Sequence, residues 1–174
     1  MARRRGGTDR GALKHTATPA VAALVAAGVP HVLHTFEVAL DGGGESFGAQ
    51  VAHALEVPPE RLFKTLMVAL PDGSLAACVV PVSGKLDLRA AAAALGVKKA
   101  VMADLAVAER RTGYVRGGIS PLGQRNRHPV VVDASALTGE VMYLSGGQRG
   151  LDVELAPADL VAVSGAVVAA IAAD

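Results

Sequence analysis

Cysteine is nearly absent from this 174-residue chain, in which Cys78 is the only one. A single cysteine excludes an internal disulfide and is typical of a protein from a reducing compartment. Cys78 lies in an apolar segment with no histidine near it in sequence to help it ionise, so we expect a structural core residue rather than a nucleophile. The five histidines show no metal-ligand spacing with one another or with Cys78. We therefore expect no metal and no other cofactor.

Long apolar runs are also missing. Hydrophobic residues make up 51% of the chain, but no stretch of about 18 of them lacks charges, glycine or proline, which excludes a transmembrane helix. The first residues, Met-Ala-Arg-Arg-Arg-Gly, lack the apolar core of a signal peptide. We expect a cytoplasmic protein without a membrane partner, folded as one domain over residues 17–174.

The net charge is small, at +1, but the charges are unevenly placed. Residues 1–16 hold five basic residues and one acidic residue, and we expect them to form a disordered basic arm. The other twelve basic residues all lie between Arg61 and Arg149, where only six acidic residues occur. This basic middle is either ordinary solvated surface or a footprint for an anionic polymer. Candidate phosphate contacts within it are Lys85, Arg116, Arg125 and Arg149.

Helical and strand patterns interleave without strict βαβ repetition, which predicts an α+β fold with a mixed β-sheet packed with helices. Side-chain caps and Gly or Pro stops predict helices from Thr18 to Gly28, from Ser46 to the Pro58-Pro59 pair, and over 87–95 and 104–112. A last helical region is predicted over 159–173, interrupted near Gly165. Runs of β-forming residues predict strands over 31–38, 98–102, 129–133, 140–144 and 151–155. A hairpin is predicted over 61–70 and 74–82, joined by a Pro71-Asp72-Gly73 turn, and a glycine turn is predicted over 145–150.

Lys64 is the odd residue of the predicted hairpin. It is a charge flanked by Phe63 and Leu66 in an otherwise apolar strand. Such a lysine lies either on a solvated face or in a binding site. The strand pattern alone leaves both interpretations open.

A glycine-rich stretch, Thr112 to Arg125, contains four glycines and a proline and therefore predicts a loop. Gly118 and Gly123 have P-loop spacing, but Gln124-Arg125 replaces the Lys and Ser or Thr of that motif, which argues against an NTPase. Ser120 lies in a segment one residue too long for a nucleophile elbow, which argues against a serine hydrolase. The loop is either a structural glycine turn or a backbone site for a phosphate or an oxyanion.

Six motifs occur in order over about ninety residues. They are Phe63-Lys64-Thr65-Leu66, Gly84-Lys85-Leu86-Asp87-Leu88, Met102-Ala103-Asp104, Thr112-Gly113-Tyr114, Gly117-Gly118-Ile119-Ser120-Pro121-Leu122-Gly123-Gln124, and Ser145-Gly146-Gly147 with Arg149-Gly150-Leu151-Asp152. Together they resemble the YbaK family of Cys-tRNA(Pro) deacylases, relatives of the editing domain of bacterial prolyl-tRNA synthetases. The resemblance runs from about Thr18 to the last residue.

The resemblance implies a single YbaK-like editing domain with a barrel-like mixed sheet. It also implies a trans-editing hydrolase that deacylates mischarged Cys-tRNA(Pro). The substrate thiol, with a pKa of about 8.5, would attack its own ester. The expected partners are the 3′-terminal adenosine and acceptor end of an aminoacyl-tRNA, with prolyl-tRNA synthetase as a candidate partner and no DNA.

The resemblance also implies the site. The expected catalytic residues are Lys64, Gly117 and Gly118, with backbone N–H groups of the loop stabilising the oxyanion. The expected substrate-binding residues are Phe36, Phe47, Tyr114, Ile119, Ser120, Pro121, Ser145 and Asp152. One departure is Phe36, which stands where many relatives have tyrosine, so any role of that phenolic hydroxyl is absent or moved.

Two alternatives remain. An Ala-tRNA(Pro) deacylase of the same superfamily would share these motifs, because one small group in a pocket is worth only about 1–3 kcal/mol of discrimination. A tRNA-binding or synthetase-binding module without catalysis would share the fold. The presence of Lys64 favours an active enzyme.

Overall fold

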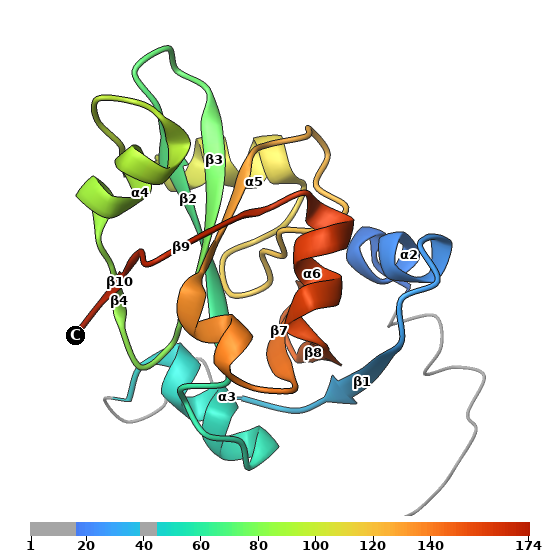
Figure 1. Ribbon diagram of the computed structural model, residues 1–174. Coiled ribbons are helices and arrows are strands. Elements are labelled where there is room, and N and C mark those ends of the chain that lie inside the picture. The colour runs from blue at the N-terminus through green and yellow to red at the C-terminus, as the bar shows by residue number, and fades with distance from the viewer. Residues whose placement is uncertain (1–16, 39–44) are drawn as a thin grey trace, which may run out of the picture.

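A computed structural model describes residues 17–38 and 45–174 (Figure 1). The expected basic arm, 1–16, lies outside the described residues. The α-helices are α2 (Pro19–Ala26), α3 (Phe47–Leu55), α4 (Leu88–Leu95), α5 (Leu105–Thr112) and α6 (Pro157–Ser164), with a 3-10 helix η1 (Ala134–Thr138). The strands are β1 (His31–Thr35), β2 (Phe63–Ala69), β3 (Leu75–Pro81), β4 (Lys85–Leu86), β5 (Val101–Met102), β6 (Val130–Asp133), β7 (Met142–Gln148), β8 (Leu151–Leu155), β9 (Val167–Ala169) and β10 (Ala172–Ala173).

The central layer is a mixed five-stranded sheet in the order β5-β2-β3-β6-β9. The hairpin β2–β3 forms as predicted and is antiparallel, and β5 pairs antiparallel with the outer edge of β2. The pairs β3–β6 and β6–β9 are parallel. All seven residues of β3 are buried, which explains why this strand is apolar throughout instead of alternating.

A second sheet, antiparallel and in the order β1-β8-β7, packs against one face of the first. Phe63, Met67 and Val79 of the first sheet share a core with Leu144 and Val153 of the second. The helices α2 and α6 cover this core on the right of Figure 1. An isolated parallel bridge between Leu62 and Tyr143 joins the two sheets where β2 begins.

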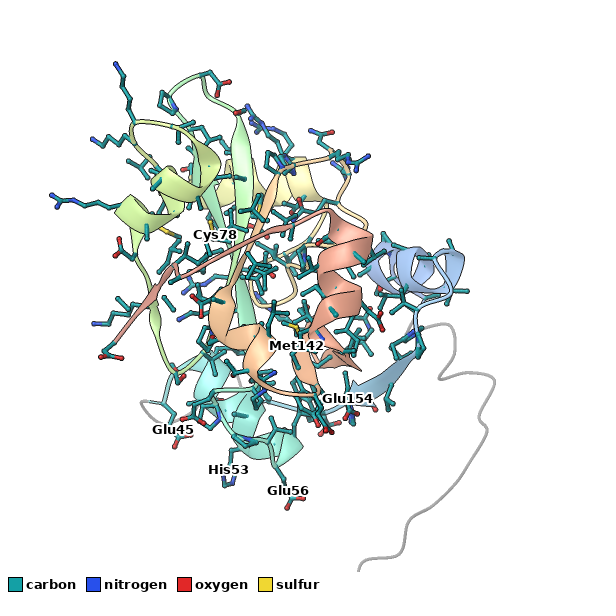
Figure 2. All side chains as sticks on the ribbon, in the orientation of Figure 1. Glu45, His53, Glu56, Cys78, Met142 and Glu154 are labelled. Atoms are coloured by element: carbon teal, nitrogen blue, oxygen red, sulfur yellow. The ribbon has the colours of Figure 1, made fainter. Side chains whose placement is uncertain are left out.

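Two smaller clusters complete the core. On the opposite face of the five-stranded sheet, Val68, Cys78 and Val131 pack with Ala91 of α4 and with Ile171. Cys78, labelled in Figure 2, is fully buried there, and burial raises the pKa of its thiol to about 11.

The third cluster lies under α3. This helix buries Val51 and Ala52, whereas His53 and Glu56 point outward (Figure 2).

The predicted mixed sheet packed with helices is confirmed by these sheets and the helices that cover them. The described strands form separate sheets and do not close into a barrel.

Local sequence determines where most helices begin. Side-chain oxygens of Thr18, Ser46 and Asp87 accept the N-cap hydrogen bonds of α2, α3 and α4, as predicted. Asp104 caps α5 in the same way. Gly96 and Gly113 have left-handed backbone conformations at the ends of α4 and α5. Within the described part of the chain, no helix is long and apolar enough to cross a membrane.

The predicted interruption of the last helical region near Gly165 is confirmed, but the helix predicted beyond it is wrong. Gly165 is left-handed, with φ of 66°, and ends α6. The following residues form β9, which pairs with β6, and β10, which pairs with β4. Alanine favours helix, but the open edges of β6 and β4 offer these residues hydrogen bonds and burial, and this tertiary pairing overrides the local preference.

The predicted glycine turn over 145–150 is also wrong in extent. Strand β7 continues to Gln148 and carries a register irregularity between Ser145 and Gln148. This irregularity is a β-bulge, in which one residue can take a positive φ. Gly147 takes it, with a φ of 102°. Only Arg149 and Gly150 make the turn to β8.

Candidate active site

A cavity of about 750 Å³ opens between β2, the start of α3 and the glycine-rich stretch from Thr112 to Arg125, called the glycine loop below. It brings together six of the eleven residues that the sequence predicts for the site. They come from five segments and are Phe47, Lys64, Gly117, Ile119, Ser145 and Asp152.

Lys64 lies on β2, half-buried, and lines the cavity. Its Nζ donates a hydrogen bond to the carbonyl oxygen of Gly84 at 2.9 Å, and burial lowers its pKa. A partly desolvated ammonium with one carbonyl partner keeps further N–H donors for a ligand. Lys64 therefore lies at a cavity and not on a fully solvated face, and its role in a binding site stays a prediction.

Gly117 and Gly118 have different surroundings. Gly117 lines the cavity and has a φ of 83°. A Cβ on Gly117 would lie 3.2 Å from Nε of Arg149 and 3.3 Å from the Phe47 ring. Gly118 is buried against β7, where a Cβ would lie 2.9 Å from the backbone of Gln148. Its N–H donates to the Val115 carbonyl oxygen at 2.8 Å, so this N–H closes a turn instead of facing a ligand.

Asp152 and Ser145 lie opposite each other on β8 and β7. Asp152 is 6% exposed. Burial raises the pKa of its carboxyl to about 7, although the neighbouring His34 lowers it in part. Near neutral pH both forms of this carboxyl are therefore populated. The protonated form can donate a proton, and the ionised form can accept one or pair with a cation.

A hydrogen-bonded group borders Asp152 on the same sheet. His34, the cross-strand neighbour of Asp152 on β1, has its Nε2 2.9 Å from Oε2 of Glu154. The hydroxyl of Tyr143 donates to the other oxygen of Glu154 at 3.0 Å. Glu154 is labelled in Figure 2 at the lower edge of the molecule.

Four of the predicted residues support the loop or lie beside the cavity instead of lining it. Tyr114 is buried and its hydroxyl donates to the Leu122 carbonyl oxygen at 2.6 Å. Ser120 is buried too, and its Oγ accepts from the Leu122 N–H, and Pro121 beside it is also buried. Phe36 lines a smaller cavity of about 220 Å³ whose walls include Phe47 and Arg149, both of which also line the main cavity.

Two arginines stand at the cavity wall. Arg116 and Arg149 are exposed and line it, and Nε of Arg149 donates to the Arg116 carbonyl oxygen at 2.7 Å. With Lys64 they give the lining three cationic side chains against one carboxyl, that of Asp152. This charge favours an anionic ligand.

Sequence reasoning missed several lining residues. Thr65 lines the cavity, and its buried Oγ1 has no hydrogen-bond partner in the described structure. Met67, Met102 and Leu105 add apolar lining. Thr65 and Met102 lie in two of the six motifs, whereas Met67 and Leu105 have no pattern that separates them from ordinary core residues. Within residues 17–38 and 45–174, no three His, Cys, Asp or Glu side chains are placed to share a metal ion.

Comparison with known proteins places the chain in a family. The model of the aminoacyl-tRNA editing domain matches residues 45–163, and the chain belongs to this family. A curated protein of Enterococcus faecalis (strain ATCC 700802 / V583), named "Putative Cys-tRNA(Pro)/Cys-tRNA(Cys) deacylase EbsC", is 37% identical over 107 residues. The match covers 62% of this chain and 65% of that relative.

Solved structures show the same fold. The crystal structure of a hypothetical protein matches with a TM-score of 0.79 and 25% identity over 90% of this chain and 100% of the other. A second, described as "a putative trans-editing enzyme for prolyl tRNA synthetase", matches with a TM-score of 0.77 and 22% identity over 91% and 98%.

Proposed function

We propose that this chain is an aminoacyl-tRNA deacylase that hydrolyses the ester of mischarged Cys-tRNA(Pro). One observation carries the proposal. In a chain of the editing-domain family, a single cavity combines Lys64, the glycine loop at Gly117 and the carboxyl of Asp152. A cation, backbone donors and a carboxyl of shifted pKa are the groups that ester cleavage uses.

The cavity suits the acceptor end of a tRNA. Its volume of about 750 Å³ falls in the range of small-molecule sites, roughly 300–1,000 Å³. In this proposal the terminal adenosine and the amino acid occupy the cavity, and Arg116 and Arg149 contact phosphates at its edge. Asp152, when ionised, pairs with the α-ammonium of the amino acid.

Hydrolysis develops negative charge on the ester carbonyl oxygen. The N–H of Gly118 is already used within the loop, so the proposed donors are the N–H groups of Gly117 and Ile119, two loop residues that line the cavity. Lys64 offsets the same charge. Removing one preorganised donor from such a site typically costs about 3 kcal/mol.

The nucleophile in this proposal belongs to the substrate. The cysteinyl thiol loses its proton, its sulfur bonds to the carbonyl carbon, and the bond from that carbon to the ribose oxygen breaks. The ribose oxygen takes up a proton, and water then hydrolyses the thioester. Cys78 does not line the cavity and its thiol pKa of about 11 disfavours a thiolate, which agrees with this assignment.

The test is a deacylation panel with the purified chain and Cys-, Ala-, Ser- and Pro-tRNA(Pro), with and without prolyl-tRNA synthetase. We expect rapid loss of cysteine and little loss of proline. Serine is the matched control, because it replaces the thiol by a hydroxyl in nearly the same shape. Faster release of alanine than of cysteine would shift the assignment to an Ala-tRNA(Pro) deacylase. Binding of tRNA without hydrolysis of any ester would leave a non-catalytic module.

A further inference from the structure

Asp133 is a buried carboxylate outside the cavity, 4% exposed, at the end of β6. Its Oδ1 accepts hydrogen bonds from the N–H groups of Ile171 at 2.8 Å and Ala172 at 2.9 Å. Its Oδ2 accepts from the N–H and the hydroxyl of Ser135. Burial alone would raise the pKa of Asp133, but these hydrogen bonds lower it overall, so the group is an anion at neutral pH.

The segment that Asp133 holds is strand β10 at the C-terminus. Ala172 and Ala173 of β10 pair antiparallel with Leu86 and Lys85 of β4. Figure 1 shows the two strands side by side on the left. The Ile171 carbonyl oxygen accepts from the Asp87 N–H at 2.8 Å, and the Ile171 side chain is fully buried. Strand β4 is therefore held along its edge by a segment that Asp133 anchors.

Gly84 directly precedes β4 and provides the partner of Lys64. Its carbonyl oxygen accepts from Nζ of Lys64. A Cβ on Gly84 would lie 3.0 Å from the Ala173 carbonyl oxygen, so the C-terminal strand lies close against this residue. A lysine side chain has many rotamers, and a carbonyl held in one place selects among them.

We infer that Asp133 and strand β10 position Lys64 in the cavity, acting through β4 and the carbonyl of Gly84. The inference rests on the proposed function for its consequence in catalysis, but the positioning itself stands on the hydrogen bonds alone. Residues 164–174 lie beyond the part of the chain that matches the family model. Asp133 is thus a positioning residue that acts at a distance.

The first test follows the lysine directly and needs no activity. Nuclear magnetic resonance relaxation of the Lys64 Cε methylene reports the order of its side chain. The variants are Asp133→Ala and a chain that stops after Ile171, which removes the pairing of β10 but keeps the buried isoleucine. Ser135→Ala is the matched control, because it removes a donor from the other carboxylate oxygen and leaves the bonds to Ile171 and Ala172 in place.

We expect an ordered Lys64 in the wild type and in Ser135→Ala, and a mobile one in Asp133→Ala and in the truncated chain. If Asp133→Ala does not fold, the truncated chain decides the question. A Lys64 as ordered in the truncated chain as in the wild type would overturn the inference, whatever the chain hydrolyses.

A double-mutant cycle gives the second test. Misplacement of a catalytic group by about 1 Å can cost up to about 100-fold in rate, and we expect about a 10-fold loss of single-turnover deacylation in Asp133→Ala or in the truncated chain. In a Lys64→Ala background the same changes should cost less than about 2-fold, because their effect passes through the lysine. Equal losses in both backgrounds would show that Asp133 serves stability alone. Absence of hydrolysis in the wild type would refute the proposed function and leave the relaxation result to judge the positioning.

Discussion

The two walls of the cavity are built in different ways. One wall presents a side chain, Lys64, on the regular strand β2, which is held in place by pairing with β3 and β5. The other wall presents backbone, at Gly117, in a loop packed so closely on β7 that Gly118 has no room for a Cβ. Truncating the lysine therefore tests chemistry with little effect on packing, whereas adding atoms to the loop tests packing and chemistry together.

Lys64→Ala should have the largest effect on rate. We expect kcat/KM for Cys-tRNA(Pro) to fall by about 100- to 1,000-fold, the usual range for losing one stabilising donor, with an unchanged circular dichroism spectrum. Lys98→Ala is the matched control, because Lys98 is exposed and does not line the cavity. A folded Lys64→Ala variant with a near wild-type rate would remove the lysine from the mechanism.

The two adjacent glycines should respond differently. In Gly118→Ala and Gly118→Val the new atoms meet the Gln148 backbone, so the thermal midpoint and the rate should fall together. In Gly117→Ala the contacts are with the side chains of Arg149 and Phe47, and the left-handed φ adds strain of about 1 kcal/mol. We expect Gly117→Ala to lower the thermal midpoint less than the Gly118 variants do, but to lower the rate more for each degree of midpoint lost. If the loss of rate followed the loss of thermal midpoint in the same proportion in all three variants, both glycines would serve folding alone.

Asp152, which also lines the cavity, should make the stability of the protein depend on pH. Its carboxyl ionises near its ordinary pKa of 3.8 in the unfolded chain and at about 7 in the folded one, so this group makes stability fall as pH rises from about 4 to about 7. Each pKa unit corresponds to about 1.4 kcal/mol. Asp152→Asn should therefore match the wild-type thermal midpoint only below about pH 4 and exceed it by several degrees at pH 8. Glu60→Gln, on an exposed residue, is the control.

The same variant tests the role of Asp152 in substrate binding. If the ionised carboxyl pairs with the substrate ammonium, the wild-type rate should rise through about pH 7, and the rise should vanish in Asp152→Asn. A rise that persists in the variant belongs to another group, such as the substrate thiol.

Binding of tRNA should weaken moderately with salt. Each single-strand phosphate contact contributes about −0.7 to the slope of log affinity against log salt concentration. Replacing Arg116 and Arg149 by glutamine should reduce the slope by roughly 1.4 if each contacts one phosphate. Arg125→Gln is a useful comparison, because Arg125 is exposed but does not line the cavity. An unchanged slope in the double variant would place the phosphates elsewhere.

Cys78→Ala should have the smallest effect on rate. Its sulfur lies in the core on the far side of the five-stranded sheet from the core that the two sheets share. We expect stability to fall by about 1 kcal/mol and kcat/KM to stay within about 2-fold. Loss of turnover in a folded variant would point instead to a protein thiol as nucleophile.

The fold was predictable where residues close in sequence, such as helix caps and turn residues, determine the structure. Side-chain caps placed the starts of α2, α3 and α4, and the Pro71-Asp72-Gly73 turn placed the hairpin. The errors lie where pairing with a distant strand decides. The alanines and valines after Gly165 became strands because β6 and β4 had free edges, and Ser145 to Gln148 stayed in a strand because a bulge absorbed the glycines.

The candidate site was predictable only in part. Lys64 was conspicuous as a charge in an apolar strand, and the motifs pointed to Ser145 and Asp152. The same motifs suggested Tyr114 and Ser120, whose polar groups instead bond within the loop. A pattern of residue types does not show which side of a loop faces the cavity. Asp133 lies far from Lys64 in sequence, and only the paired strands reveal its connection to the lysine through Gly84.

The most direct test of this account asks whether the cavity holds the aminoacylated end of tRNA. A cysteinyl adenosine with an amide in place of the ester cannot be cleaved readily, and the methionine methyl resonances report where it binds. Met67 and Met102 line the cavity, whereas Met142 is buried in the core and labelled in Figure 2. The account predicts that the analogue shifts the Met67 and Met102 resonances, leaves Met142 unchanged, and loses affinity in Lys64→Ala. Saturable binding that leaves Met67 and Met102 unshifted would contradict it.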